Sequence, residues 1–229
     1  MPAVTFDDVS VLFDGDSSPT LDRINLELTE HRIGIIGSNG SGKSTLARLI
    51  NGLGSATSGR VRVDGRDVDK HGREIRRRVG FVFSDAENQI VMPQVRDDVA
   101  FSLRRLKLPR LERDARIDAA LDRFGLTGLA DASPHTLSGG QKQLLALAAV
   151  LVMEPALIIA DEPTTLLDLR NRARIAREFA RLEQQLIVVT HDLEILEGFD
   201  RVICLDNGRV VADGAPREVC ERYRALMLA

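Results

Sequence analysis

The chain has 229 residues, of which 44% are hydrophobic and 28% charged, and its formal net charge is −3. This length and balance fit one large α/β domain, and the slight negative charge argues against a broad nucleic-acid-binding face. Two cysteines are too few for a disulfide framework, so we expect reduced thiols. No apolar run approaches a membrane span of about 18 residues, and no signal-peptide pattern is present, so we expect a cytoplasmic protein.

The N-terminal part alternates apolar and polar positions over residues 3–36. A period of two predicts an antiparallel β layer, with a turn at residues 14–16. The layer leads into residues 32–36, a short apolar run that predicts a buried strand. A hairpin is predicted around residues 61–65, and residues 79–83 predict another buried strand.

The stretch from Gly37 to Thr45 fits the pattern G-x-x-x-x-G-K-[ST] and lies between a predicted strand and a predicted helix. Glycines allow successive backbone N–H groups to surround a phosphate, and the helix N-terminus adds its positive dipole. We therefore predict that the loop binds a nucleotide, with Lys43 at the β- and γ-phosphates and Ser44 on Mg²⁺. The predicted nucleotide-binding residues of the loop are Gly37, Ser38, Asn39, Gly40, Ser41, Gly42, Lys43, Ser44 and Thr45.

This motif alone has alternatives. A Gly/Ser-rich loop that only caps a helix would look similar, and the pattern does not distinguish a kinase, a GTPase and a motor ATPase.

The following region, residues 97–153, changes to a helical period, as at Ile117, Leu121 and Phe124. We predict a mostly helical lobe, about residues 90–153, inserted into the α/β core.

Two carboxylates follow a strand that has no polar residue. Residues 157–160 predict a strand covered on both faces, and Asp161 and Glu162 come directly after it. At the C-terminal end of a parallel strand they would lie beside the phosphate loop. We predict that Asp161 holds Mg²⁺ through its waters and that Glu162 polarises the attacking water as general base. The alternative is a solvated acidic turn.

His191 follows the next predicted strand, residues 186–189. It could contact the γ-phosphate or orient water, and a surface histidine at a helix cap is the alternative.

Residues 202–205 and 209–211 flank a hairpin turn, and residues 216–229 predict a last helix with a proline at its first position.

A second phosphate-binding surface is predicted at residues 138–141. Ser138 and Gln141 have the spacing of a capping box before an apolar helix, and two glycines lie between them. A helix N-terminus of this kind can hold phosphate. One nucleotide cannot easily use two such surfaces of one chain, whereas two chains that face each other could.

These motifs, in this order, resemble the ATP-binding cassette ATPases over essentially the whole chain. The resemblance implies a P-loop NTPase fold of class α/β, with a RecA-like core, an N-terminal antiparallel β layer and an inserted helical lobe. It also implies a head-to-tail dimer, in which ATP lies between the phosphate loop of one chain and the signature residues of the other. Those signature residues would be Ser138, Gly139, Gly140 and Gln141. Asp168 would belong to the dimer loop, and Phe13 would stack on adenine.

Residues 79–89 and 95–101 resemble the ATPases of energy-coupling-factor importers and, within that group, the ATPase of the biotin module. This resemblance implies an ATP-hydrolysing motor that is peripheral at the cytoplasmic face of the inner membrane. Its partners would be a second copy or a related ATPase, a transmembrane coupling protein that contacts segment 84–101, and a membrane substrate-capture protein. No nucleic-acid partner is expected.

The chain departs from the family pattern at two positions. Ser84 stands where the family has a glutamine that contacts Mg²⁺ and water, and serine would reach the metal only through water. Leu166 replaces a small residue in the loop before Asp168. Three alternatives stay open: a soluble cassette ATPase acting on DNA or ribosomes, an importer ATPase for another vitamin or a metal ion such as cobalt, and a regulatory nucleotide-binding subunit with little turnover.

Overall fold

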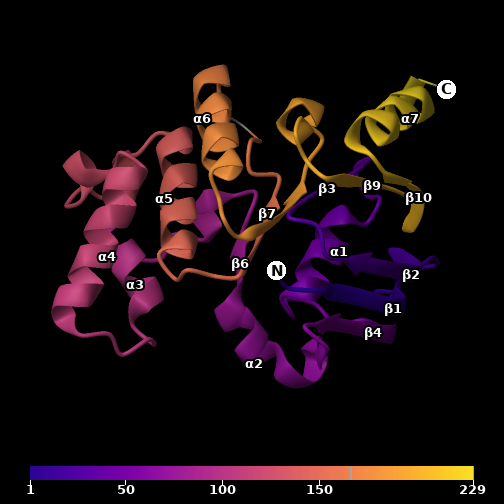
Figure 1. Ribbon diagram of the computed structural model, residues 1–229, viewed down its shortest axis with the longest axis horizontal. Helices are drawn as coiled ribbons and strands as arrows, with labels where there is room; N and C mark the ends of the chain where they lie inside the picture. The colour runs from indigo at the N-terminus through magenta and orange to yellow at the C-terminus, as the bar shows by residue number, and fades with distance from the viewer. Residues whose placement is uncertain (166, 229) are drawn as a thin grey trace.

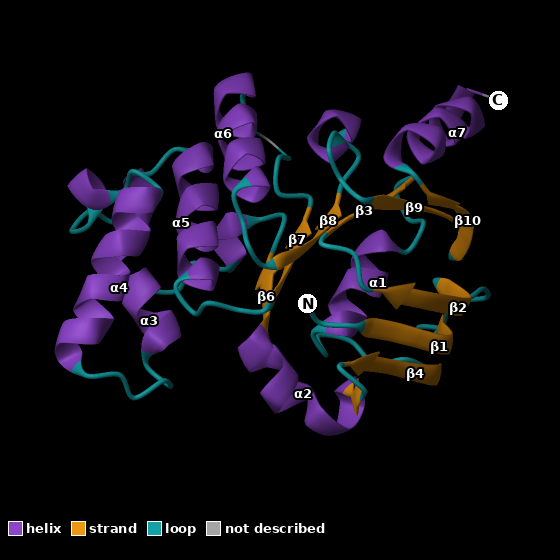
Figure 2. Ribbon diagram, viewed as in Figure 1, coloured by secondary structure: helices purple, strands orange, loops and turns teal. Residues whose placement is uncertain are grey.

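Two β-sheets organise the chain, and the larger one carries the predicted functional loops (Figures 1 and 2). The computed structural model describes residues 1–165 and 167–228. The larger sheet has the strand order β10-β9-β3-β8-β7-β6, in which only β10 is antiparallel to its neighbour. Its strands are β3 (Arg32–Gly37), β6 (Val79–Val82), β7 (Leu157–Asp161), β8 (Gln185–Val189), β9 (Arg201–Asp206) and β10 (Arg209–Gly214).

The smaller sheet is the predicted antiparallel β layer. It has the order β2-β1-β4-β5, so β1 pairs with β2 on one side and, on the other, with a hairpin that follows the phosphate loop. Apolar residues alternate with polar ones because one face is buried, as along β2, where Ile24, Leu26 and Leu28 are buried. The strands are β1 (Val4–Val11), β2 (Leu21–Leu28), β4 (Ser58–Val63) and β5 (Arg66–Asp67).

Seven α-helices of the described residues pack around these sheets. They are α1 (Lys43–Ile50), α2 (Val68–Arg78), α3 (Val95–Leu103), α4 (Arg110–Arg123), α5 (Gly139–Leu151), α6 (Leu169–Ala180) and α7 (Pro216–Leu228). The helices α3, α4 and α5 come between β6 and β7 in sequence and form one side of the molecule in Figure 1. In the part of the chain that the structure describes, no helix is both long and apolar enough to cross a membrane.

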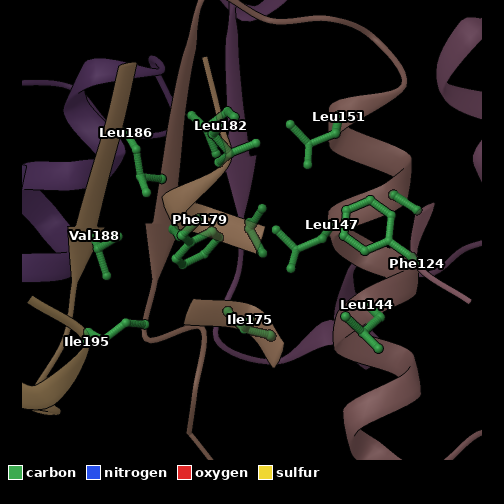
Figure 3. Close-up of a cluster of buried hydrophobic side chains, with 14 of the residues drawn as sticks. Phe124, Leu144, Leu147, Leu151, Ile175, Phe179, Leu182, Leu186, Val188 and Ile195 are labelled. Carbon is green, nitrogen blue, oxygen red and sulfur yellow. The ribbon is translucent and has the colours of Figure 1, made fainter. Parts of the chain in front are cut away.

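The central strands separate two hydrophobic cores because their alternate side chains point to opposite faces. On β7, Ile158 and Ala160 belong to one core, and Leu157 and Ile159 to the other. The first core lies between the sheet and the helices; Figure 3 shows Leu147 of α5 and Phe179 of α6 facing one another in it. The second core joins the sheet to α1 and to the β layer. Strands buried on both faces explain the continuous apolar runs in the sequence.

The phosphate-loop strand β3 lies at the centre of the larger sheet, between β8 and β9. The turn between β9 and β10 also contacts the loop, because the N–H of Gly208 donates to the carbonyl of Ser41 over 3.3 Å. The carbonyl of Gly208 accepts from the N–H of Asp22, at the start of β2, over 2.9 Å. One turn near the C-terminus therefore links the phosphate loop to the β layer.

Candidate functional site

The phosphate loop runs from the end of β3 to the start of α1, as its sequence predicts. Gly37, Gly40 and Gly42 all have positive φ angles, of 150°, 81° and 98°. A Cβ on Gly37 would lie 2.2 Å from the carbonyl oxygen of Leu205, so a side chain is excluded there by backbone as well as by conformation. The N-cap of α1 is Gly42, which has no side chain to take up the first free N–H groups. Those groups are available to an anion.

Lys43 is folded back over this loop. Its Nζ donates to the carbonyls of Gly37 and Ser38 over 3.0 and 2.8 Å, and only 6% of the residue is exposed. Burial lowers the pKa of Lys43, and the carboxylates of Glu162 and Asp161 oppose that shift. The loop thus holds a desolvated cation in reach of its own backbone, and an incoming phosphate would be a stronger partner for that cation than neutral carbonyls.

Ser44 and Asp161 form a buried pair of oxygen donors. The hydroxyl of Ser44 donates to Oδ1 of Asp161 over 2.9 Å, and Asp161 is 2% exposed. Burial raises the pKa of Asp161, although the Ser44 hydrogen bond and the charges of Arg48 and Lys43 act in the other direction. The sequence-based expectation that β7 delivers Asp161 beside the phosphate loop is met by this contact.

Glu162 and His191 meet at the ends of the neighbouring strands β7 and β8. The ring nitrogen Nδ1 of His191 lies 2.8 Å from Oε2 of Glu162, and the backbone N–H of His191 donates to the same oxygen over 3.4 Å. Glu162 has a φ of +52°, an unusual angle for a residue other than glycine. Its N–H is held by the carbonyl of Val189 over 2.8 Å, which fixes the strand end. The side chain of His191 is about half exposed, whereas that of Glu162 is largely buried.

The residues Ser138–Gln141 start helix α5 with a complete capping box. The Ser138 N–H donates to Oε1 of Gln141 over 2.8 Å, and the Gln141 N–H donates to Oγ of Ser138 over 3.3 Å. A Cβ on Gly140 would lie 2.4 Å from the Asn171 side chain, whereas one on Gly139 would meet nothing within 4 Å. In Figure 1, α5 stands well apart from α1. Within one chain, the structure does not bring this second surface to the phosphate loop.

Three further predicted residues lie at the borders of elements. Phe13 follows β1 and is 54% exposed, Ser84 is exposed beyond the end of β6, and Asp168 caps α6 by accepting from the Asn171 N–H over 2.8 Å. Leu166, the departure noted in the dimer loop, lies outside the described residues.

The sequence analysis did not assign a function to Gln89 or Asp98. The Gln89 side chain accepts from the Phe83 N–H over 3.1 Å and donates to the Ala146 carbonyl over 3.4 Å. Asp98, 5% exposed, accepts from the N–H groups of Val91 and Met92 over 2.8 and 3.1 Å. The only signals in the sequence are an acidic residue in the first turn of a helix and a glutamine in a loop, and both are too common to single these residues out.

The phosphate loop, the paired carboxylates and the parallel sheet define a P-loop nucleotide hydrolase. The family model for the ABC transporter matches residues 21–165. The chain therefore belongs to the ABC transporter family, as an ATPase subunit.

Several relatives are similar over nearly the whole chain. The biotin transport ATP-binding protein BioM of Rhizobium etli is 48% identical, over 90% of this chain and 92% of the relative. BioM of Rhodobacter capsulatus is 44% identical, over 96% and 94%. The energy-coupling factor transporter ATP-binding protein EcfA1 of Caldanaerobacter subterraneus is 42% identical, over 92% and 78%.

Two solved structures share the fold. CbiO1 of Clostridium perfringens, which is part of the ABC transporter complex CbiONQ, superposes with a TM-score of 0.84 at 34% identity, over 98% of this chain and 93% of that one. The ATP-binding cassette MJ0796, solved as a dimer in a post-hydrolysis state with ADP and Pi, gives 0.83 at 30% identity, over 93% and 99%. These similarities confirm the predicted fold class and the ATPase family.

Proposed function

We propose that this chain is the ATP-hydrolysing motor of an energy-coupling-factor type importer, and that biotin is the cargo. The observation that supports the chemistry is the meeting of four groups at one sheet edge: the phosphate loop, Asp161, Glu162 and His191. The names of the relatives support the transport role, since proteins called BioM and EcfA1 match this chain over most of its length.

The residues divide the hydrolysis reaction between them. The loop N–H groups and Lys43 bind the β- and γ-phosphates, and Phe13 stacks on the adenine. Glu162 accepts a proton from the attacking water, and its contact with His191 holds the carboxylate at the strand end. His191 then orients the water or contacts the γ-phosphate through its other ring nitrogen.

Ser44 and Asp161 are the residues that would hold Mg²⁺. A hydroxyl and a carboxylate 2.9 Å apart are hard oxygen donors of the kind this ion prefers, so the pair fits the metal. Ser84, exposed after β6, would contribute only through water. When bound, Mg²⁺ neutralises charge on the phosphate oxygens.

The separation of α5 from α1 supports the head-to-tail dimer. Each ATP would lie between the phosphate loop of one chain and Ser138, Gly139, Gly140 and Gln141 of a second copy or a related ATPase, with Asp168 in the contact between the chains. ATP would hold the two chains together, and hydrolysis would let them separate. This cycle is the mechanical output that an importer needs.

The docking surface for a transmembrane coupling protein would include segment 84–101. A groove of about 670 Å³ adjoins this segment, and Phe81, Phe83 and Phe101 are among the residues that line it. No carboxylate of a described residue lines the groove. The basic residues that line it are Arg73, Arg76, Arg77, Arg104 and Arg105. A groove lined by aromatic and cationic side chains suits a protein segment that carries carboxylates. The subunit would be peripheral at the cytoplasmic face of the inner membrane.

The test is to extract the tagged protein from native membranes with detergent and identify what co-purifies. We expect integral membrane proteins in fixed ratio, with biotin bound to the capture subunit. Another vitamin or a cobalt ion there would correct the cargo alone. If only ribosomal or DNA-bound material were recovered, the transport function would be wrong and the cassette chemistry would need another target.

Two charge-reversal variants, one in the groove and one outside it as the control, test the docking surface. Arg73→Glu with Arg77→Glu reverses two charges that line the groove. This variant should lower recovery of the membrane proteins at unchanged ATPase activity of the isolated subunit. Arg110→Glu with Arg113→Glu changes two arginines on α4 that do not line the groove, and recovery should persist.

A further inference from the structure

The segment between β6 and α3 rests on the helix that the signature residues begin. Strand β6 ends at Val82, so the backbone of Phe83 has no partner in the strand ladder. Two glutamines take that role: Gln89 accepts from the Phe83 N–H over 3.1 Å, and Gln143 of α5 donates to the Phe83 carbonyl over 3.4 Å. Gln143 is only 4% exposed, so its amide is committed to this contact.

Gln89 also contacts α5 directly. Its amide donates to the Ala146 carbonyl over 3.4 Å, within the second turn of that helix. A third contact joins Lys142 of α5 to Glu87. Three residues of α5, Lys142, Gln143 and Ala146, are thus bonded to the segment 83–89.

The far end of the segment is held by α3. The buried carboxylate of Asp98 accepts from two consecutive N–H groups, those of Val91 and Met92, over 2.8 and 3.1 Å. The Val91 side chain is nevertheless 62% exposed. The segment is therefore fixed through its backbone while it offers side chains to the outside.

Ser84 does not contribute to this framework. Its side chain is exposed and forms no hydrogen bond with any described residue. A serine side chain is also too short to connect the nucleotide and the segment directly. Without a direct contact at residue 84, a change at the nucleotide would reach segment 83–92 through a water molecule at Ser84 or through other residues.

We propose that Gln89 is the positioning residue that couples signature helix α5 to segment 83–92. When Ser138 at the start of α5 closes on the ATP of a second chain, α5 would carry the segment with it through Gln89, Gln143 and Lys142. The nucleotide state would thus reach the partner-facing segment without a direct contact at residue 84. This inference rests on the proposed ATP-dependent dimer.

Hydrogen–deuterium exchange in the Glu162→Gln protein, with and without ATP, tests the coupling. We expect ATP to change exchange in the peptide covering residues 83–92. Gln89→Met keeps the side-chain length and removes both hydrogen bonds. It should leave ATP affinity and the dimer intact, but should abolish the ATP-dependent difference in that peptide, with exchange at the Phe83 amide rising about tenfold or more.

The matched control is Asn88→Ala, because within the described residues the Asn88 side chain bonds only to Asp85 in the same turn. This variant should keep the ATP-dependent difference. If Gln89→Met does not fold, Gln143→Met removes the other contact to Phe83 and should give the same loss. An intact difference in either folded glutamine variant would overturn the coupling alone. Failure of the Glu162→Gln parent to dimerise with ATP would instead overturn the dimer of the proposed function, and the coupling with it.

Discussion

His191 Nδ1 lies 2.8 Å from Oε2 of Glu162, and the two residues follow the ends of the adjacent parallel strands β8 and β7. In the tautomer that carries the proton on Nδ1, this nitrogen donates to the carboxylate and Nε2 is an acceptor. The carboxylate, in turn, is held by a side chain and a backbone N–H of the same histidine. Both groups are positioned before any substrate arrives.

Glu162→Gln should lower steady-state ATP hydrolysis by about 10²- to 10⁴-fold, because an amide cannot accept the proton of the attacking water. ATP binding should persist, and an ATP-stabilised dimer should accumulate. Phosphate release and light scattering measure the two effects. Glu194→Gln is the control, an exposed carboxylate just beyond β8. Normal turnover in Glu162→Gln would show that another group is the general base.

Lys43→Ala should weaken ATP binding by about 10- to 100-fold, the effect of losing a charge-assisted hydrogen bond of about 1.5–3 kcal/mol. The loop also loses the ammonium contacts with Gly37 and Ser38. Calorimetric titration with ATP measures the affinity, and Lys70→Ala, an exposed lysine of α2, is the control. An unchanged affinity would exclude Lys43 from phosphate binding.

Asp161→Asn should stabilise the nucleotide-free protein at neutral pH while reducing its ATPase activity. Burial raises the pKa of Asp161, so its ionised form disfavours the folded state at every pH above that raised value. The gain in melting temperature should be full at pH 7.5 and should disappear as the pH falls toward the unfolded pKa of about 4. Melting curves of both proteins across this range measure it.

The control for this series is Asp16→Asn, which changes an exposed carboxylate in the first turn of the chain. Its melting temperature should follow that of the unmodified protein at each pH. A melting temperature of Asp161→Asn below the unmodified value at pH 7.5 would contradict the unfavourable ionisation of Asp161.

Gly139→Ala should leave the fold intact and lower ATP turnover about tenfold or more, because a methyl group would lie where the signature approaches a phosphate. The structure has open space at this position, so melting should not change. Gly128→Ala, also in open space, is the control for both measurements. Full turnover in Gly139→Ala dimers would contradict the phosphate contact.

Gly140→Ala, in contrast, should lower the stability of the fold, because the added Cβ would lie 2.4 Å from the Asn171 side chain, which would have to move. We expect a loss of stability of about 1–3 kcal/mol, typical of overpacking. We therefore expect that Gly139 is required for ATP turnover and that Gly140 is required for packing against Asn171.

The sequence predicted the elements whose patterns are strong. The strands β7 and β8 have only apolar side chains over residues 157–160 and 186–189, and both were confirmed. Helix α2 was missed, because its sequence is highly charged and only Val68 and Ile75 are buried. Its start is fixed by Asp67, which caps the N–H groups of Asp69 and Lys70, a local signal that also fits a turn.

Motifs predict the candidate site residues, whereas they do not predict the contacts that these residues make. The motif predicts that Ser44 and Asp161 are close, since both follow parallel strands. The hydrogen bond from Gln89 to Ala146 joins residues 57 positions apart, and no period or spacing encodes it. Contacts of this kind depend on how the helices α3 to α5 pack, which the sequence pattern leaves open.

The central position of β3 has a consequence for synthesis of the protein on the ribosome. Both strands that flank β3, β8 and β9, come after β7 in the sequence, and the turn that bonds to Ser41 includes Gly208. The phosphate loop is therefore synthesised long before the strands that support it. We expect a nascent chain to bind ATP only after β8 and β9 have left the ribosome and paired with β3.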